Sequence, residues 1–378
     1  MSHPAGLLVL PAEEVRRLFP LDLAIESQRA AFTALGRGTA VLPPRLLVPG
    51  AGESVAFCYA ARLSPDGAAV SKFGSVNPGN AARGLPSVNA LITVLDAETG
   101  QPVAVMDGTT VTTIRTCAAS AVAALALARP GSRTLAVLGS GVQAKAHVAA
   151  LSRVLDLADV RIWSPSAERR AALARSAGGA AQEAGPVVRS TESAREAVRG
   201  ADVIACCTTS FTPVLDVDWL ADGATVISIG SFAPDRQEVP AELATRAAAV
   251  VVDDVPTAMA DAGPIMAAAA SQQSVAERLI PLGDVVAGLR VARHSDCDLV
   301  YYNSVGLGVQ DTAAALAIVR AARCGAISLK RRDWSHRAGQ REYHQAGHPD
   351  RGRRVKGVQH VRQRDRVARR RAGTDAAR

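Results

Sequence analysis

The sequence predicts a two-domain α/β protein. The chain has 378 residues, which is more than one ordinary core accommodates and suits two domains. Its second half alternates short apolar runs with helical segments, as in a parallel sheet. Its first half contains strand-like runs broken by Gly, Pro and Asn, which is typical of α+β structure. A composition with 48% hydrophobic and 21% charged residues excludes global disorder.

The first half begins with a helix and continues with strands. Residues 12–36 are predicted to form one amphipathic helix, because large apolar side chains recur near helical spacing. Strands are predicted at residues 55–59, 69–73, 87–95 and 102–106, with hairpin-turn chemistry at residues 96–100. Residues 109–129 are predicted to form a long Ala-rich helix that Pro130 and Gly131 end.

The second half contains the predicted parallel sheet. Its strands are expected at residues 134–138, 160–163, 203–207, 226–229 and 248–252. Residues 301–322 form a final strand-like stretch followed by an Ala-rich helix. No internal repeat is evident in the sequence.

A glycine-rich motif follows the first strand of this sheet. Gly139-x-Gly141-x-x-Ala144 directly follows a predicted strand and begins a helix. The first Gly permits the tight turn, the second lets the backbone approach a pyrophosphate, and Ala144 allows close helix–strand packing. The helix N-terminus would supply N–H donors to the phosphates. In this context the motif predicts a dinucleotide-binding, Rossmann-type domain, and a purely structural Gly-rich turn is the alternative.

The end of the second strand bears on the choice of dinucleotide. NAD enzymes usually place an acidic residue there against the ribose 2′-hydroxyl, whereas this chain has Ser164. Nearby hydroxyls, together with Arg169 and Arg170, could hold a 2′-phosphate, so the sequence favours NADP(H) over NAD(H). The two arginines could equally belong to a solvated helix face.

The net charge of +8 comes from the C-terminal segment. Residues 330–378 contain 16 basic and 5 acidic residues, which leaves the rest of the chain at −3. We interpret residues 326–378 as a basic, disordered tail, because they contain few large apolar side chains. A shifted reading frame and a nucleic-acid-binding segment are the alternatives, and nucleic acid is not the expected partner.

Several classes are disfavoured by other features. The start MSHPAGLLVLPAEE has no charged n-region, and the apolar stretch 117–128 is too short to span a bilayer. The six cysteines form no CxxC pair and no His lies at zinc-finger spacing, so no metal site is expected. We therefore expect a cytoplasmic protein with reduced thiols and no membrane contact.

Several separate motifs resemble the ornithine cyclodeaminase/mu-crystallin family. Ser71-Lys72-Phe73 is followed by NPGN and then by GLPSVNALITVLDAETGQPVAVMDGTTVTTIRTCAASAVA. GSGVQA and YYNSVGLGVQD come later, in the order that this family uses. The resemblance covers roughly residues 7 to 325. It implies a homodimer with an N-terminal substrate-binding and dimerisation domain (1–118), a Rossmann NAD(P)-binding domain (119–300), and residues 301–325 returning to the first domain.

The resemblance also implies roles for individual residues. Arg45, Lys72 and Arg115 resemble the residues that bind the substrate carboxylate, and Lys72 and Arg115 are the candidate catalytic residues. Arg is suited to a carboxylate because its guanidinium forms a bidentate fork. The positions that resemble cofactor contacts are Ser87, Arg115, Gly139, Gly141, Val142, Gln143, Ala144, Ser164, Thr208 and Ser304. Without the family, the cations would be surface charges, and Thr208 and Ser304 ordinary strand-end hydroxyls.

One position departs from the cyclodeaminase pattern. The stretch IGSFAPDRQE has Phe232 where cyclodeaminases carry an Asp that exchanges protons with the substrate amine. Phe cannot transfer a proton, and Asp235 is either a turn residue or a substitute acid. The sequence therefore favours an NAD(P)H-dependent reductase of a small cyclic imino acid, with pyrroline-2-carboxylate as a typical substrate. The alternatives are an ornithine cyclodeaminase, an alanine- or opine-type dehydrogenase, and a non-catalytic NADP-dependent binder of small ligands.

Overall fold

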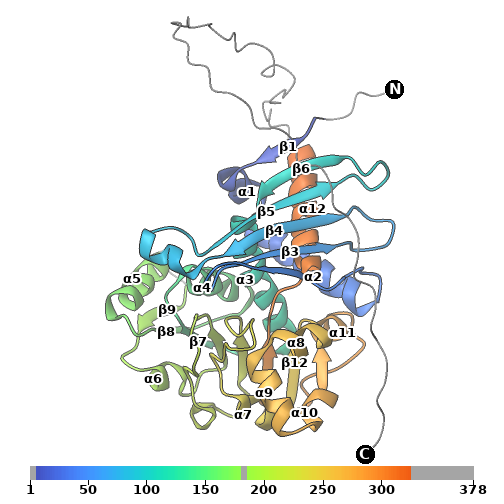
Figure 1. The fold of residues 1–378 in the computed structure, drawn as a ribbon. Helices are drawn as coiled ribbons and strands as arrows, with labels where there is room; N and C mark the ends of the chain where they lie inside the picture. Colours follow the sequence, from blue (N-terminus) through green and yellow to red (C-terminus); the bar gives the residue numbers. More distant parts are fainter. Residues whose placement is uncertain (1–5, 180–184, 325–378) are drawn as a thin grey trace, which may run out of the picture. The chain divides into compact units, whose positions relative to one another are not determined.

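The computed structural model describes residues 6–179 and 185–324, so the predicted basic tail lies outside the described residues (Figure 1). Two sheets organise this part of the chain. The six-stranded sheet has the order β1-β6-β5-β4-β3-β2, and the eight-stranded sheet has the order β13-β12-β14-β11-β10-β7-β8-β9. The mixed α/β class with one parallel sheet is as predicted.

The six-stranded sheet belongs to the first 107 residues. Its strands β2 to β6 are antiparallel, and β1 pairs with β6 in parallel. The strands are β1 (Leu8–Leu10), β2 (Leu46–Pro49), β3 (Val55–Ala61), β4 (Val70–Val76), β5 (Val88–Leu95) and β6 (Pro102–Asp107). A 3-10 helix, η1 (Pro78–Arg83), lies between β4 and β5.

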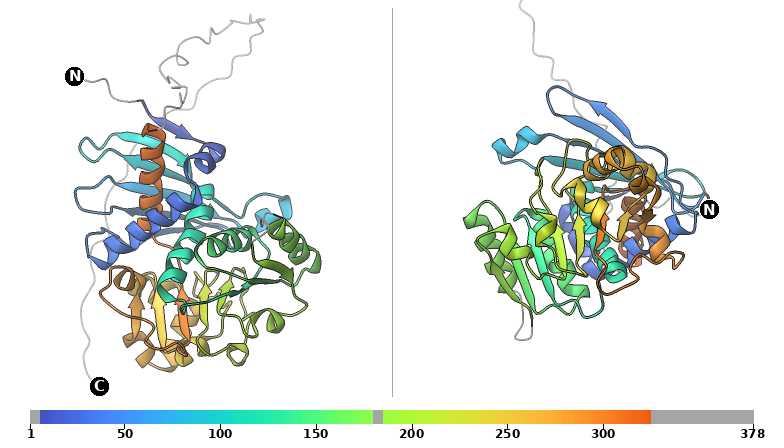
Figure 2. Two further views of the ribbon diagram at one scale, coloured as in Figure 1. Left: turned by 180° about the vertical axis from the view of Figure 1, so that it is seen from behind. Right: turned by 90° about the horizontal axis from the view of Figure 1, so that it is seen from below.

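Three helices cover one face of this sheet (Figure 2). They are α2 (Leu21–Gly36), α3 (Gly108–Leu127) and α12 (Gly308–Cys324), and they also pack against one another. Side chains that point toward them, such as Ile92 and Met106, are buried, whereas Phe73 and Leu91 on the opposite face are 60% and 57% exposed. The alternation along β4 and β5 thus places Phe73 and Leu91 on the outer face, together with polar side chains such as Ser75 and Asn89.

The predicted helix over residues 12–36 is wrong in one respect, because the structure contains two helices there. Helix α1 (Ala12–Leu18) ends at Phe19, and α2 begins after Pro20. Pro has no backbone N–H to donate to the preceding turn, so it ends one helix and suits the start of the next. The apolar periodicity continues across this break, which is why the sequence suggested a single helix.

The eight-stranded sheet is parallel throughout. Every residue of its central strands β10, β11, β12 and β14 is buried, as expected for a sheet covered on both faces. The strands are β7 (Thr134–Leu138), β8 (Asp159–Trp163), β9 (Val187–Ser190), β10 (Val203–Cys206), β11 (Thr225–Ser228), β12 (Ala249–Val252), β13 (Leu279–Pro281) and β14 (Val300–Asn303).

Helices connect most of these strands. They are α4 (Val142–Val154), α5 (Ala167–Gly178), α6 (Ala194–Val198), α7 (Ala241–Arg246), α8 (Val255–Asp261), α9 (Gly263–Ser271), α10 (Ser274–Glu277) and α11 (Leu282–Val286), with a 3-10 helix η2 (Val217–Trp219). Helix α11 packs against α2, where Gly36 lies so close to Gly283 that an added Cβ would be 2.2 Å from the Gly283 oxygen. This contact joins the parallel-sheet half to the antiparallel half.

Two elements belong to both halves of the described chain. Helix α3 contacts β5 of one sheet and β11 of the other. It continues through residue 118, where the sequence places the boundary between the two domains. This domain boundary stays a prediction. Strand β14 lies between β11 and β12, whereas α12 directly after it packs against α2, α3 and β4. The assignment of residues 301–325 to a segment that returns to the first domain stays a prediction.

Helix α3 is long and apolar enough to cross a membrane by length and composition alone. However, 72% of its most apolar window is buried inside the protein. Its first turn is capped by Asp107, whose carboxylate accepts a hydrogen bond from the Thr110 N–H at 2.7 Å. We therefore describe α3 as a core helix that packs between the two sheets.

Candidate functional site

The glycine-rich motif forms the turn between β7 and α4. Gly139 has φ +126°, a conformation that favours glycine, and a Cβ there would lie 2.4 Å from the Cys207 carbonyl oxygen. A Cβ added to Gly141 would meet nothing within 4 Å, so the space beside it is open. Ala144 is completely buried, whereas Val142 is 70% exposed at the start of α4. The turn therefore has the tight first Gly, the open second Gly and the close packing that a pyrophosphate site requires.

Gln143 provides a second test of whether a dinucleotide fits. Its Oε1 atom is buried and has no hydrogen-bond partner among the described residues. Buried polar atoms are rarely left unpaired, so this atom is suited to a donor from a ligand such as a ribose hydroxyl. Both observations at this turn fit a dinucleotide bound at the carboxyl edge of the parallel sheet.

The residues expected near the ribose of a bound dinucleotide lie at the end of β8. Ser164 is buried, and its hydroxyl donates to the Ser166 carbonyl at 3.2 Å. Arg170 is buried too; it donates to the Ser164 carbonyl at 3.2 Å and forms an ion pair with Glu192. Arg169 remains exposed. Thus Arg170 is already paired, and the Ser166 hydroxyl caps α5 by accepting from the Arg169 N–H at 3.3 Å. The Ser166 hydroxyl proton and the exposed Arg169 guanidinium are the donors at this position that could bind a 2′-phosphate.

Glu238 organises the loops after β10 and β11, and the sequence analysis missed it. Its carboxylate accepts hydrogen bonds from the Thr208 N–H and hydroxyl and from the Ser228 hydroxyl, each at 2.8 Å, and from the Gly230 N–H. Burial raises the pKa of Glu238, and these hydrogen bonds oppose the increase. Thr208 is therefore held in place by a buried acid.

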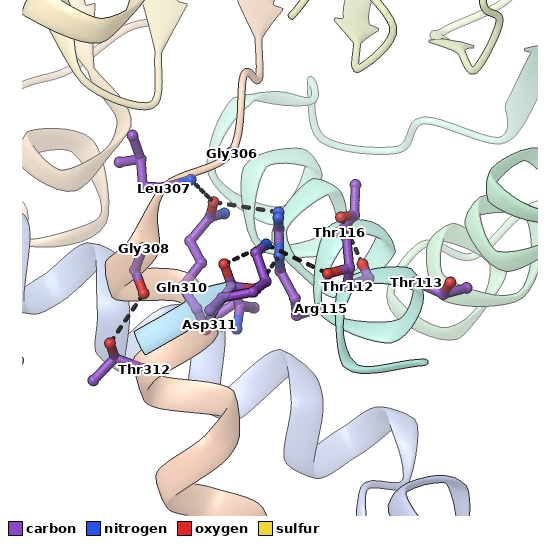
Figure 3. A network of polar contacts seen from close by, with 12 residues as sticks. Thr112, Thr113, Arg115, Thr116, Gly306, Leu307, Gly308, Gln310, Asp311 and Thr312 are labelled. Atoms are coloured by element: carbon purple, nitrogen blue, oxygen red, sulfur yellow. Dashed lines mark hydrogen bonds and ion pairs between the residues drawn. The ribbon is translucent and has the colours of Figure 1, made fainter. Parts of the chain in front are cut away.

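The second part of the site is a buried cluster of charges between β4, α3 and α12. Lys72 Nζ lies 2.6 Å from Asp311 Oδ2, and Arg115 Nε donates to Asp311 Oδ1 at 3.1 Å. Figure 3 shows Arg115 on α3 facing Asp311 and Gln310 on α12. The three charged side chains are at most 7% exposed. The structure thus brings together Lys72 and Arg115, as predicted, around an acid that the prediction did not include.

Burial and neighbouring charges shift two of these groups. Burial lowers the pKa of Lys72 to about 8; the nearby Asp311 opposes this effect and Arg115 adds to it. Burial alone would raise the pKa of Asp311, but Arg115 and Lys72 together hold it below its usual value. Lys72 is consequently the member of the cluster whose charge changes in the mildly alkaline range.

Arg45 reaches the same region from the segment before β2. It forms an ion pair with Asp261 at the end of α8, and its Nη1 donates to the Tyr59 hydroxyl at 3.3 Å. The Tyr59 ring lies 4.9 Å from Lys72 Nζ, within cation–π range. Arg45 therefore belongs to the region of Lys72 and Arg115, with a carboxylate already bound to its guanidinium.

Ser304 is positioned by Asp253, which follows β12. The Asp253 carboxylate accepts from the Ser304 hydroxyl at 3.0 Å, from the Gly306 N–H at 2.8 Å and from the Tyr302 hydroxyl. A Cβ on Gly306 would lie 3.1 Å from Arg115 Nη2, so this loop runs directly past the Arg115 guanidinium. The loop joins the cofactor edge of the sheet to the charge cluster.

Ser87 lies apart from these contacts. It lies just before β5, and its carbonyl accepts a hydrogen bond from the Asn77 N–H at 2.7 Å. Among the described residues, Lys72, Arg115 and Thr208 have other hydrogen-bond partners than Ser87. Its predicted role as a cofactor contact stays a prediction.

At the position where cyclodeaminases carry an Asp, the structure has a stack of aromatic rings and a cation. The Arg236 guanidinium lies 5.1 Å from the centre of the Phe232 ring and 4.6 Å from that of Phe211. Asp235 is exposed on the adjoining turn. The immediate surroundings of Phe232 thus contain a positive charge where the cyclodeaminase pattern has a negative one.

Comparison with known proteins supports the resemblance. The model of the ornithine cyclodeaminase/mu-crystallin family matches residues 7–325. A Delta(1)-pyrroline-2-carboxylate reductase of Bacillus cereus is 30% identical over 317 residues, which are 82% of this chain and 94% of that protein.

Two solved structures have the same fold. The Delta(1)-pyrroline-2-carboxylate reductase of Thermococcus litoralis, in complex with NADH and L-proline, has a TM-score of 0.78 at 28% identity, covering 84% of this chain and 97% of its own. An archaeal alanine dehydrogenase dimer with bound NAD has a TM-score of 0.77 at 31% identity, covering 84% and 96%.

Proposed function

Because the chain belongs to the ornithine cyclodeaminase/mu-crystallin family, we propose that it is an NAD(P)H-dependent reductase of a small cyclic imino acid. Pyrroline-2-carboxylate and piperideine-2-carboxylate are the typical substrates of the proposed reaction. The observation that carries the proposal is the buried cluster in which Lys72 and Arg115 surround a single carboxylate beside a dinucleotide-binding edge.

The positive charges of the site suit the substrate carboxylate. Lys72, Arg115 and Arg45 are three cations, and the acids that pair with them are Asp311 and Asp261. A third acid near Arg115, Asp253, is already bound by the Tyr302 and Ser304 hydroxyls and the Gly306 N–H, so the cations keep donors for one further anion. A substrate carboxylate provides that anion and is held by fixed donors in a region with little water.

The absence of an acid at residue 232 suits imine reduction better than cyclodeamination. When bound, the reduced nicotinamide supplies a hydride to the imine carbon. An imine that binds in its protonated form needs no proton donor from the protein in order to accept this hydride. Phe232 is compatible with that requirement, whereas cyclodeamination needs repeated proton transfer at the substrate nitrogens.

The cofactor is held by the turn between β7 and α4 and by the loops after β8 and β10. Gly139, Gly141 and the first turn of α4 would hold the pyrophosphate, and Gln143 would accept a hydrogen bond from a ribose hydroxyl. Thr208 would contact the cofactor from the loop that Glu238 fixes. Ser166 and Arg169 favour NADP(H) over NAD(H), since Arg169 is exposed beside the position of the ribose.

The protein is proposed to act as a homodimer in the cytoplasm. The outer face of the six-stranded sheet carries a row of cross-strand neighbours, Leu46, Cys58, Phe73 and Leu91. Leu46, Phe73 and Leu91 are each more than half exposed, which is unusual for three large apolar side chains in one row. A second copy of the chain that covers this face with its own would remove them from water.

Purified protein tests the proposed reaction directly. Pyrroline-2-carboxylate with NADPH or NADH is expected to give proline with stoichiometric oxidation of the cofactor. L-Ornithine with catalytic NAD is expected to give neither ammonia nor proline. Ammonia and proline from ornithine without net use of cofactor would contradict the proposal and would identify a cyclodeaminase.

An alanine-type dehydrogenase is the second candidate. It is favoured by the similarity to the archaeal alanine dehydrogenase and by the same cluster of cations, which suits any 2-imino or 2-oxo acid. Pyruvate with ammonium and NADH distinguishes this candidate. A kcat/KM for pyruvate plus ammonium above that for the cyclic imine would favour the dehydrogenase.

A further inference from the structure

Asp311 is the centre of the buried charge cluster, although it is distant in sequence from Lys72 and Arg115. It lies in the first turn of α12, and its side chain is 2% exposed. One oxygen lies 2.6 Å from Lys72 Nζ on β4, and the other accepts from Arg115 Nε on α3 at 3.1 Å. A single carboxylate thus joins three elements of the fold.

Without this carboxylate the cluster would contain two neighbouring positive charges away from water. Such an arrangement is costly, and Arg cannot lose its proton in a protein, so Lys72 would be the group to become neutral. The groups that face Lys72 are Asp311 from α12, Arg115 from α3, and Tyr59 from β3, whose ring lies 4.9 Å from Nζ. Among these, Asp311 alone favours the ammonium form through a negative charge.

The same carboxylate also fixes the directions of the two cations. Lys72 Nζ forms an ion pair with Asp311 Oδ2 at 2.6 Å and donates one hydrogen bond, to Thr112 Oγ1 at 3.4 Å. Arg115 uses Nε for Asp311 and Nη1 for the Gln310 amide oxygen at 3.4 Å. Arg115 Nη2 makes no hydrogen bond within the described part of the chain, so each cation keeps donor capacity that Asp311 does not occupy.

We propose that Asp311 is a positioning residue that keeps Lys72 charged and holds Lys72 and Arg115 so that their remaining donors bind one substrate carboxylate. The inference rests on the proposed function for the identity of that carboxylate, but the effect of Asp311 on Lys72 requires no substrate. Asp311 itself makes no contact with the reacting atoms in this proposal.

Nuclear magnetic resonance of the lysine side-chain nitrogens measures the effect on Lys72 directly. The chain contains four lysines, so protein labelled with ¹⁵N at lysine Nζ gives few signals, and Lys72→Met identifies the one from Lys72. In Asp311→Asn the titration midpoint of Lys72 is expected to fall by about one pH unit or more below that of the wild type, because the main favourable charge is removed. Asp156→Asn is the matched control: it neutralises the 88%-exposed partner of Arg133, and the Lys72 midpoint should not change.

Kinetics provide the second readout. If imine reduction needs charged Lys72, activity declines as the pH rises through the pKa of Lys72, and this decline should move to lower pH in Asp311→Asn. KM for pyrroline-2-carboxylate should increase about tenfold or more, with a smaller change in kcat. Asp311→Glu retains the charge but displaces the oxygens, so the Lys72 midpoint should stay near the wild-type value while KM still increases.

The outcomes separate the two proposals. An unchanged Lys72 midpoint in a folded Asp311→Asn protein, with folding checked by circular dichroism and NADH fluorescence, would overturn the role of Asp311. If Asp311→Asn does not fold, the KM of Asp311→Glu tests the role of Asp311 instead. A wild-type KM in that variant would overturn this role. A lowered midpoint together with no imine reduction by the wild type would leave the role of Asp311 standing and would reject the imino-acid reductase.

Discussion

His147 shows how a single buried side chain is held in one protonation state. It lies on α4, and its Nδ1 is 2.8 Å from the Gln143 carbonyl oxygen, which can only accept a hydrogen bond. Nδ1 therefore carries the proton, and Nε2 accepts from the Ser120 hydroxyl at 2.8 Å. Burial lowers the pKa of His147 to about 4, so the ring is neutral at physiological pH and joins the cofactor helix to α3.

This environment predicts a pH dependence of stability. Between about pH 6.5 and pH 4 the unfolded chain takes up a proton at His147 that the folded chain does not, so stability falls as the pH falls through this window. The loss from this one group is about 3 kcal/mol at its limit. His147→Gln keeps a donor and an acceptor but cannot be protonated, so it should show a shallower loss in urea unfolding measured from pH 7 to pH 4.

The same urea-unfolding measurements can contradict the predicted role of His147. His147→Gln is expected to be less stable than the wild type at pH 7, since the fit around the imidazole is lost. The acids of the two proteins titrate alike, so the difference between the two pH profiles isolates His147. Parallel profiles would mean that the ring is charged in the folded protein or accessible to water.

At the scale of elements, Glu238 connects the ends of two neighbouring strands. It binds the Thr208 N–H after β10 and the Gly230 N–H and Ser228 hydroxyl at the end of β11. These are the loops that face the proposed cofactor, so one carboxylate sets the separation of both. A flexible version of either loop would have to be ordered again each time a cofactor binds.

Glu238→Gln tests this connection. The amide has a donor where the carboxylate had an acceptor, so at least one buried N–H or hydroxyl loses its partner, at a cost of about 1–3 kcal/mol. We expect a lower melting temperature and an affinity for NADH that is reduced about tenfold, measured by quenching of protein fluorescence. Glu242→Gln on the surface of α7 is the control and should leave both values unchanged.

Elements with a strong local signal could be predicted from the sequence. Strand β7 has the predicted bounds, and the turn at Gly139 and the helix after it were expected from the glycine spacing. Strands β1, β2, β9 and β13 were not predicted, because each has only three or four residues, too few for a clear period-2 pattern. The position of β14 between β11 and β12 could not be predicted either, because it depends on contacts between residues that are distant in sequence.

The candidate site was predicted in part for a related reason. Lys72, Arg115 and Arg45 belong to motifs that resemble a family, so their proximity was expected. The acids that hold the site together, Asp311 and Glu238, end two of the quoted stretches, YYNSVGLGVQD and IGSFAPDRQE, but no role was predicted for either, because charged residues are usually exposed. Only the fold shows that each accepts hydrogen bonds or ion pairs from several elements.

At the scale of the whole molecule, the outer face of the six-stranded sheet is the surface to test for self-association. Phe73 and Leu91 are direct cross-strand neighbours on β4 and β5, and both are more than half exposed. Leu91→Lys would place a charge in the middle of the proposed dimer interface, where removing it from water would be costly.

Light scattering coupled to size-exclusion chromatography is the corresponding measurement. The wild type is expected to elute as a dimer, and Leu91→Lys as a monomer or a rapidly dissociating dimer. Leu289→Lys is the matched control, since Leu289 is 64% exposed but lies after α11 in the other half of the chain. A Leu91→Lys protein that remains fully dimeric at micromolar concentration would exclude this face as the interface.

The position of β14 has a consequence for the order in which the protein can be built during synthesis. Among the described strands, β12 pairs with β13 and β14 and has no hydrogen bonds to β11. Strand β14 is the last of the eight to leave the ribosome, so until then the parallel sheet exists as two separate pieces. Helix α12, which carries Asp311, follows at once. A nascent chain halted before residue 300 would therefore have neither a continuous sheet nor a completed charge cluster.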